Sequence, residues 1–86
     1  MLTKFKLKIQ PPNEEDGHEI EFFDITEAQA RTEFAIYARN NNMPAGTKIS
    51  LSEWNYNEKN GGWYISNIFI IAYKGITDDL ETIQKG

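Results

Sequence analysis

The stretch "SNIFIIAYKG", residues 66–75, places the strongest constraint on what this chain can fold into. Side chains of a β-strand point alternately to the two faces of its sheet, so a strand with one face in water alternates apolar and polar residues. This stretch does not alternate. Its two faces are both apolar, with Ile68, Ile70 and Ala72 on one and Phe69, Ile71 and Tyr73 on the other. The sequence therefore predicts a strand that needs cover on both faces.

Two shorter strands are predicted near the start of the chain. "KFKLKIQ", residues 4–10, alternates Lys with apolar residues and is followed by two prolines, which cannot continue a sheet ladder. "HEIEFF", residues 18–23, alternates Glu with apolar residues after an Asp16-Gly17 turn. In a hairpin of these strands the Lys row would face the Glu row, so we interpret the lysines as ion-pair partners rather than as a phosphate site.

One helix is predicted between the strands, within residues 24–42. Thr26 and Gln29 have the spacing of a capping box, in which each side chain accepts a hydrogen bond from the backbone of the other residue. An apolar stripe recurs at helical spacing and is expected to pack on a sheet. Its members are Ala30, Phe34, Tyr37, Ala38 and Asn41. Met43-Pro44 ends the helical pattern.

A second, longer hairpin is predicted over residues 44–75, with "NEKNGG" as its turn. Ile49 and Leu51 have one parity, whereas Trp54 and Tyr56 have the other. One extra residue in a strand reverses the facing of everything beyond it, so we expect a β-bulge near residues 52–53.

These elements predict an α+β protein with a single domain over residues 1–75 and the order β-β-α-β-β. One helix would pack on a four-stranded, mostly antiparallel sheet. We expect the spatial order 2-1-4-3, with the apolar fourth strand central and parallel to the first, and the polar third strand at an edge. Residues 76–86 are expected to form a C-terminal tail, either a short helix or a frayed end.

The residues needed for common catalytic chemistry are few. The chain has one His and no Cys, too few for a zinc site, and His18 is expected to be a solvated edge residue. "NEEDG", residues 13–17, lacks the ligand spacing of a calcium loop, and no phosphate-binding loop or nucleophile elbow occurs. The remaining carboxylate pairs lie in segments expected to be solvated. We therefore expect no enzyme, no cofactor and no metal.

Charge and composition favour a small acidic cytoplasmic protein. The net charge is −4, which disfavours nonspecific binding to nucleic acid. The Lys-interrupted first ten residues lack the apolar run of a signal peptide, and no segment has the length of a membrane span. Absence of Cys suits a reducing compartment.

Two functions remain open. The first is a protein-binding module, with a foreign partner or a second copy covering the spare face of the last strand; the tail or Lys stems could also cover it. The second is binding of single-stranded nucleic acid by stacking bases on an aromatic platform at the long hairpin. Nucleic acid is the less favoured partner because few lysines lie nearby. The candidate interface residues are Ile68, Ile70, Trp54, Tyr56, Trp63 and Tyr64.

The order of two strands, a helix entered through "ITEAQA" and a "PAG" turn before a strand resembles the small phage inhibitor of bacterial RNA polymerase, over about half of the chain. The resemblance implies a modulator of a host protein but transfers no residue roles, because its elements are general capping and turn motifs. Small size and many Asn and Lys residues also fit a phage or mobile-element product.

Overall fold

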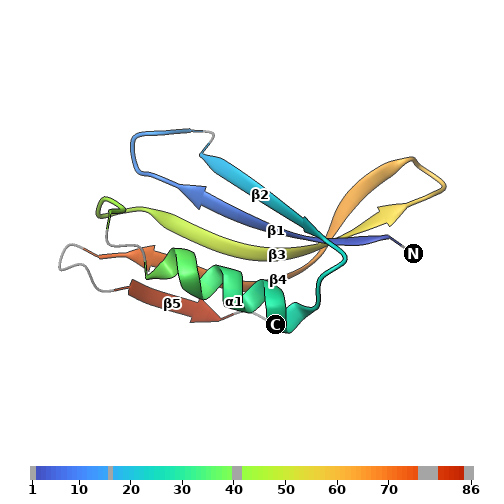
Figure 1. Ribbon diagram of the computed structural model, residues 1–86. Helices are drawn as coiled ribbons and strands as arrows, with labels where there is room; N and C mark the ends of the chain where they lie inside the picture. Colours follow the sequence, from blue (N-terminus) through green and yellow to red (C-terminus); the bar gives the residue numbers. More distant parts are fainter. Residues whose placement is uncertain (1, 16, 40–41, 76–79, 85–86) are drawn as a thin grey trace.

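The computed structural model describes residues 2–15, 17–39, 42–75 and 80–84, the last by backbone only. One antiparallel sheet carries one helix (Figure 1). The elements in chain order are β1 (Thr3–Gln10), β2 (His18–Phe23), α1 (Glu27–Ala38), β3 (Lys48–Asn57), β4 (Gly62–Lys74) and β5 (Leu80–Gln84). The predicted α+β class and the order β-β-α-β-β are confirmed, and β5 adds a strand to the predicted four.

The predicted spatial order of the strands is wrong. The sheet has the order β2-β1-β3-β4-β5, every pair is antiparallel, and β3 is central rather than at an edge. The apolarity of a strand did not predict its position in the sheet, because the one helix among the described residues covers a single face of that sheet. A central strand then needs a single apolar row, which Ile49 and Leu51 supply with no exposed surface. The polar residues of β3 lie on the other face.

The C-terminal tail also differs from the prediction of a short helix or a frayed end. Residues Leu80–Gln84 pair with the second half of β4, Ile71 opposite Ile83. Without β5, that half of β4 would present unpaired backbone N–H and C=O groups at a sheet edge, and such groups seek partners. The tail therefore widens the sheet beside β4, and its backbone does not cross the face of the sheet (Figure 1).

Helix α1 lies on one face of the sheet and forms the core with it (Figure 1). The predicted capping box is present: the Gln29 N–H donates to Thr26 Oγ1 at 3.1 Å and the Thr26 N–H donates to Gln29 Oε1 at 2.8 Å. The helix ends at Ala38 and is therefore shorter than the predicted segment, residues 24–42. Ala30 and Phe34 are buried, with Tyr37 and Ala38 packed beside them, whereas Asn41 lies outside the described residues. The predicted apolar stripe thus faces the sheet.

Two extra residues in β4 set the direction of its side chains. Leu51 pairs with Ile70 but Ser52 pairs with Ile68, so Phe69 has no partner in β3. In the same way Glu53 pairs with Asn67 but Trp54 pairs with Ile65, so Ser66 is the second extra residue. The Ser66 hydroxyl donates to Glu53 of β3, with its Oγ 3.1 Å from the backbone oxygen and 2.9 Å from Oε1. The predicted irregularity is at the right place in the ladder, but the extra residues are in β4 and not in β3.

These bulges correct the predicted facing of the apolar strand. Ile70 and Ala72 pack toward the helix with the bulged Phe69, whose ring centroid is 6.0 Å from that of Phe5. Ile71 and Tyr73 lie on the opposite face, which Ile68 shares. The sequence alternation failed here because a bulge reverses facing, so Ile68 and Ile70 lie on different faces.

Packing of α1 is tested by enlarging its smallest buried side chain. Ala30 has no exposed surface, so Ala30→Leu is expected to lower the free energy of unfolding by about 1–3 kcal/mol through overpacking. The same change at Ala28, which is exposed, should alter it by less than about 0.5 kcal/mol. Urea denaturation followed by circular dichroism measures both variants. Equal effects would contradict the observed orientation of the helix.

Candidate functional site

The sheet surface opposite α1, here called the open face, gathers charged and aromatic side chains from four strands. No helix of the described chain covers it. By strand register, β1 to β4 place four lysines and two glutamates on it, an excess of two positive charges among the side chains that the structure describes, on a protein whose net charge is −4. These residues are Lys4, Lys6, Lys8, Lys48, Glu19 and Glu21. The open face is thus locally cationic.

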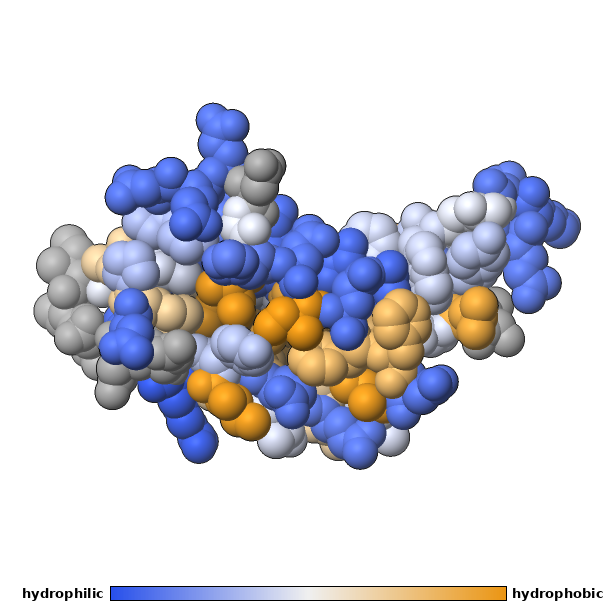
Figure 2. Space-filling model, turned by 45° about the horizontal axis from the view of Figure 1, so that its top comes forward, coloured by the Kyte–Doolittle hydropathy of each residue, from blue (hydrophilic) through white to orange (hydrophobic). Residues whose placement is uncertain are grey.

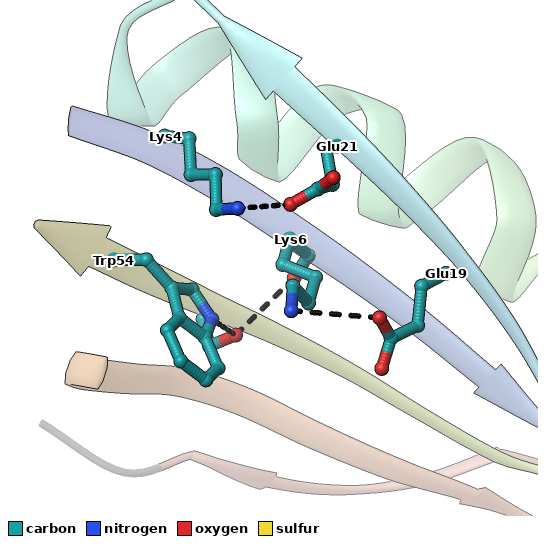
Figure 3. Close-up of polar contacts among 6 residues, drawn as sticks. Lys4, Lys6, Glu19, Glu21 and Trp54 are labelled. Carbon is teal, nitrogen blue, oxygen red and sulfur yellow. Dashed lines mark hydrogen bonds and ion pairs between the residues drawn. The ribbon is translucent and has the colours of Figure 1, made fainter. Parts of the chain in front are cut away.

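The predicted pairing of the Lys and Glu rows is confirmed, with a diagonal offset (Figure 3). Lys4 bridges to Glu21, and Lys6 Nζ lies 3.4 Å from Glu19 Oε2, although Glu19 is directly opposite Lys8 in the ladder. Because of this offset, both glutamates pair with the first two lysines of β1. Lys8 therefore has no carboxylate partner among the described residues.

Lys4 joins the ion pair to an aromatic cluster. It is 7% exposed, and its Nζ is 4.3 Å from the Trp63 ring centroid. Trp63 meets Tyr56 and Phe23 edge-on, with centroids 5.3 and 6.1 Å apart. Because Trp63 is on β4 and Phe23 on β2, these contacts bring the long hairpin over the first two strands. The cation–π and aromatic contacts give this part of the predicted platform a packing role.

Trp54 is held by a second set of contacts (Figure 3). Its Nε1–H donates to Ser52 Oγ at 2.9 Å, and the Ser52 hydroxyl donates to the backbone oxygen of Lys6 at 3.4 Å. The Lys6 ammonium lies over the indole, 4.2 Å from the ring centroid. One face of the Trp54 ring is therefore occupied by a cation from the same sheet.

The six predicted interface residues do not form one surface. Trp54, Tyr56, Trp63 and Ile68 share the open face. Ile70 packs against the helix-side core, and Tyr64, which is 46% exposed, has the parity of the opposite face. The prediction missed Ile65, Ile71 and Lys48. Ile65 shares the parity of Trp63 and could have been found, whereas the facing of Ile71 depends on the bulge at Phe69.

A shallow cavity of about 300 Å³ lies on the open face. Its apolar part is formed by three isoleucines of β4 and by Trp54 of β3, and lysines of β1 and β3 line it as well. These isoleucines and lysines are Ile65, Ile68, Ile71, Lys6, Lys8 and Lys48. Such a cavity can accept aliphatic groups flanked by negative charge.

A larger cavity, of about 430 Å³, belongs to the end of the β3–β4 hairpin, where it lies among residues 56–59 and Tyr64. That end projects from the body of the molecule and is mostly hydrophilic, whereas apolar side chains gather over the middle of the view in Figure 2. Tyr56 and Asn57 of β3, Tyr64 of β4 and the turn residues Glu58 and Lys59 line this hollow.

The described residues also limit other chemistry. No three His, Cys, Asp or Glu side chains among them are grouped to hold a metal ion. None of the helices in the described part is long and apolar enough to cross a membrane. Comparisons with protein-family models, curated proteins and solved structures found no match to this chain. Function is therefore inferred from the open face itself.

The Lys4–Glu21 pair makes stability depend on pH. The hydrogen bond from Lys4, with the positive charges of Lys4 and Lys6, lowers the pKa of Glu21 below its ordinary value of 4.5. A carboxyl group whose pKa is lowered by folding stabilises the fold above its unfolded-state pKa, and this contribution is lost as the pH falls through the folded-state value. Glu21→Gln is thus expected to be destabilising at about pH 7, with the difference from wild type vanishing in acid.

Denaturant titrations from about pH 7 into acid measure the free energy of unfolding of both proteins. Glu14→Gln is the matched control. Glu14 is an exposed loop residue outside every ion pair of the described chain, so its substitution should leave the pH profile unchanged. A Glu21→Gln profile parallel to that of the wild type would show that the ion pair contributes nothing to folding.

Proposed function

We propose that this protein is a non-enzymatic protein-binding module that docks a partner on its open face. The observation that carries the proposal is the apolar row of β4 on a face without a covering helix. Ile65 is 45% and Tyr73 40% exposed, and Ile68 and Ile71 are half-buried. Full burial of one such side chain contributes about 1.5–3 kcal/mol, so a partner that covers the row gains enough to bind.

Cover from within the chain is less well supported. The tail strand β5 lies beside β4 and not across it. The ammonium of Lys6 is held by Trp54 and Glu19, which fixes the end of its side chain there. A second copy docked face to face would bring two locally cationic surfaces together, and like charges oppose association. A foreign protein is therefore the partner we favour.

We further propose that this module acts in the cytoplasm as a phage or mobile-element modulator of a host protein. The support is compositional: a small chain without cysteine and with many Asn and Lys residues. A binding role also needs only surface, which a domain of this size can supply more readily than a deep pocket.

Single-stranded nucleic acid is the alternative partner, supported by the tryptophans and lysines of the open face. Stacking requires free ring faces, and one face of each tryptophan is taken, by Lys6 on Trp54 and by Lys4 on Trp63. Titration of a dT oligonucleotide at low salt, followed by Trp fluorescence, is therefore expected to produce no change at tens of micromolar. Quenching that saturates in this range would favour the alternative, since each stacked base contributes about 1–3 kcal/mol.

The docking proposal is tested by pull-down from bacterial lysate with matched isoleucine variants. Ile68→Lys places a charge on the open face, where it should remove specific partners and leave the fold intact, as judged by circular dichroism. Ile36→Lys makes the same change on the outer side of α1, where Ile36 is 58% exposed, and should retain them. A partner retained equally by both variants contradicts docking on the open face.

Sedimentation distinguishes a foreign partner from a second copy. Wild-type protein is expected to be monomeric at micromolar concentration. A dimer that Ile68→Lys dissociates and Ile36→Lys preserves would reassign the open face to self-association.

A further inference from the structure

We infer that the open face accepts an acidic amphipathic helix of the partner protein, an inference that rests on the proposed docking function. Three observations define this occupant. They are the position of the cavity on the face of the sheet, the lysines in its lining that have no carboxylate partner among the described residues, and the three isoleucines of its apolar part.

The position of the cavity favours a helix over an extended peptide. An added strand would pair at a sheet edge, where backbone groups are available, and not on the face, where its own N–H and C=O groups would be buried without partners. A helix satisfies its backbone internally and buries one apolar side. Helix α1 already packs in this way on the other face of the sheet. A partner helix would complete a third layer.

The lysines select negative charge. Lys8 and Lys48 both line the cavity, and neither has a carboxylate partner among the described residues. Glu19, the one glutamate that lines it among the described residues, is occupied by Lys6 at 3.4 Å. A helix with Glu or Asp beside its apolar residues would pair these lysines. Because the whole protein has a net charge of −4, this attraction is local and acts at contact distance.

The apolar part of the cavity selects aliphatic anchors. Ile65, Ile68 and Ile71 supply aliphatic surface, and the one aromatic ring among the described lining residues, Trp54, has the Lys6 ammonium over one face, 4.2 Å from its centroid. A helix presents apolar side chains at positions i, i+3 and i+4, which lie on one side and can contact neighbouring isoleucines together. The chemistry of the cavity therefore matches leucine or isoleucine at this spacing, flanked by carboxylates.

Two designed peptides test this inference on the full chain. Each is a capped helix of about 18 residues with Leu at helical spacing, and the flanking residues are Glu in one peptide and Lys in the other. We expect the Glu peptide to bind and to shift the backbone amide NMR signals of β3 and β4. The Lys peptide should bind about tenfold more weakly, and added salt should reduce the difference.

Charge reversal supplies the internal control. The double variant Lys8→Glu/Lys48→Glu is expected to invert the preference so that the Lys peptide binds more tightly. Lys59→Glu makes the same change at the end of the long hairpin, which does not line this cavity, and should leave the preference unchanged. Loss of binding in Ile65→Lys and Ile68→Lys, with wild-type circular dichroism, would place the peptide on the isoleucines.

Each contrary result has a separate meaning. Equal binding of both peptides, abolished by Ile68→Lys, overturns the acidic preference and leaves the docking surface in place. Absence of peptide binding, while Ile68→Lys still loses a lysate partner, overturns the helical occupant and keeps the proposed function. Tighter binding of the dT oligonucleotide than of the Glu peptide, lost in the double lysine variant, overturns a protein partner. Failure of both the peptide and the pull-down experiments overturns both proposals.

Discussion

Pairing of β4 with the central strand β3, with two residues of β4 left extra, is the constraint on which the rest of this structure depends. Because Phe69 is bulged, Phe69, Ile70 and Ala72 all contribute to the helix side, and Ile71 joins Ile68 on the open face. Without that bulge, strict alternation could not place Phe69 and Ala72 in one core. The same irregularity therefore completes the core and exposes the apolar row that we assign to a partner.

The open face is ordered by electrostatics as well as by packing. Three lysines of β1 face two glutamates of β2, and the diagonal ion pairs satisfy Lys4 and Lys6 while Lys8 is left over. The two paired lysines also lie on Trp63 and Trp54, which makes the tryptophans part of the framework. Surface ion pairs contribute about 0–1 kcal/mol each, and the cation–π and aromatic contacts add to them in holding the hairpin over the sheet.

In a small domain with one helix on one face of a sheet, the two faces of the sheet differ in burial. Ala30 and Phe34 of the helix cover one side, whereas the open side combines exposed Ile65 and half-buried isoleucines with lysines that have no carboxylate partner among the described residues. Apolar surface supplies binding free energy, and the charges at its margin supply selectivity among partners. This division of roles is the basis of our proposal that an acidic helix docks on the open face.

Local chemistry was enough to predict several parts of this protein. The alternation of Lys, Glu and apolar residues determined the first hairpin and its facing ion pairs, and the Thr26–Gln29 capping box determined the start of α1. These features depend on residues a few positions apart or directly opposite in a hairpin. Strand order, the β5 pairing and the opposite facing of Ile68 and Ile70 were decided only in the tertiary structure. Each depends on backbone hydrogen bonds between segments that are distant in the sequence. The type of side chain says little about which segments pair, because every residue except proline carries the same backbone donor and acceptor.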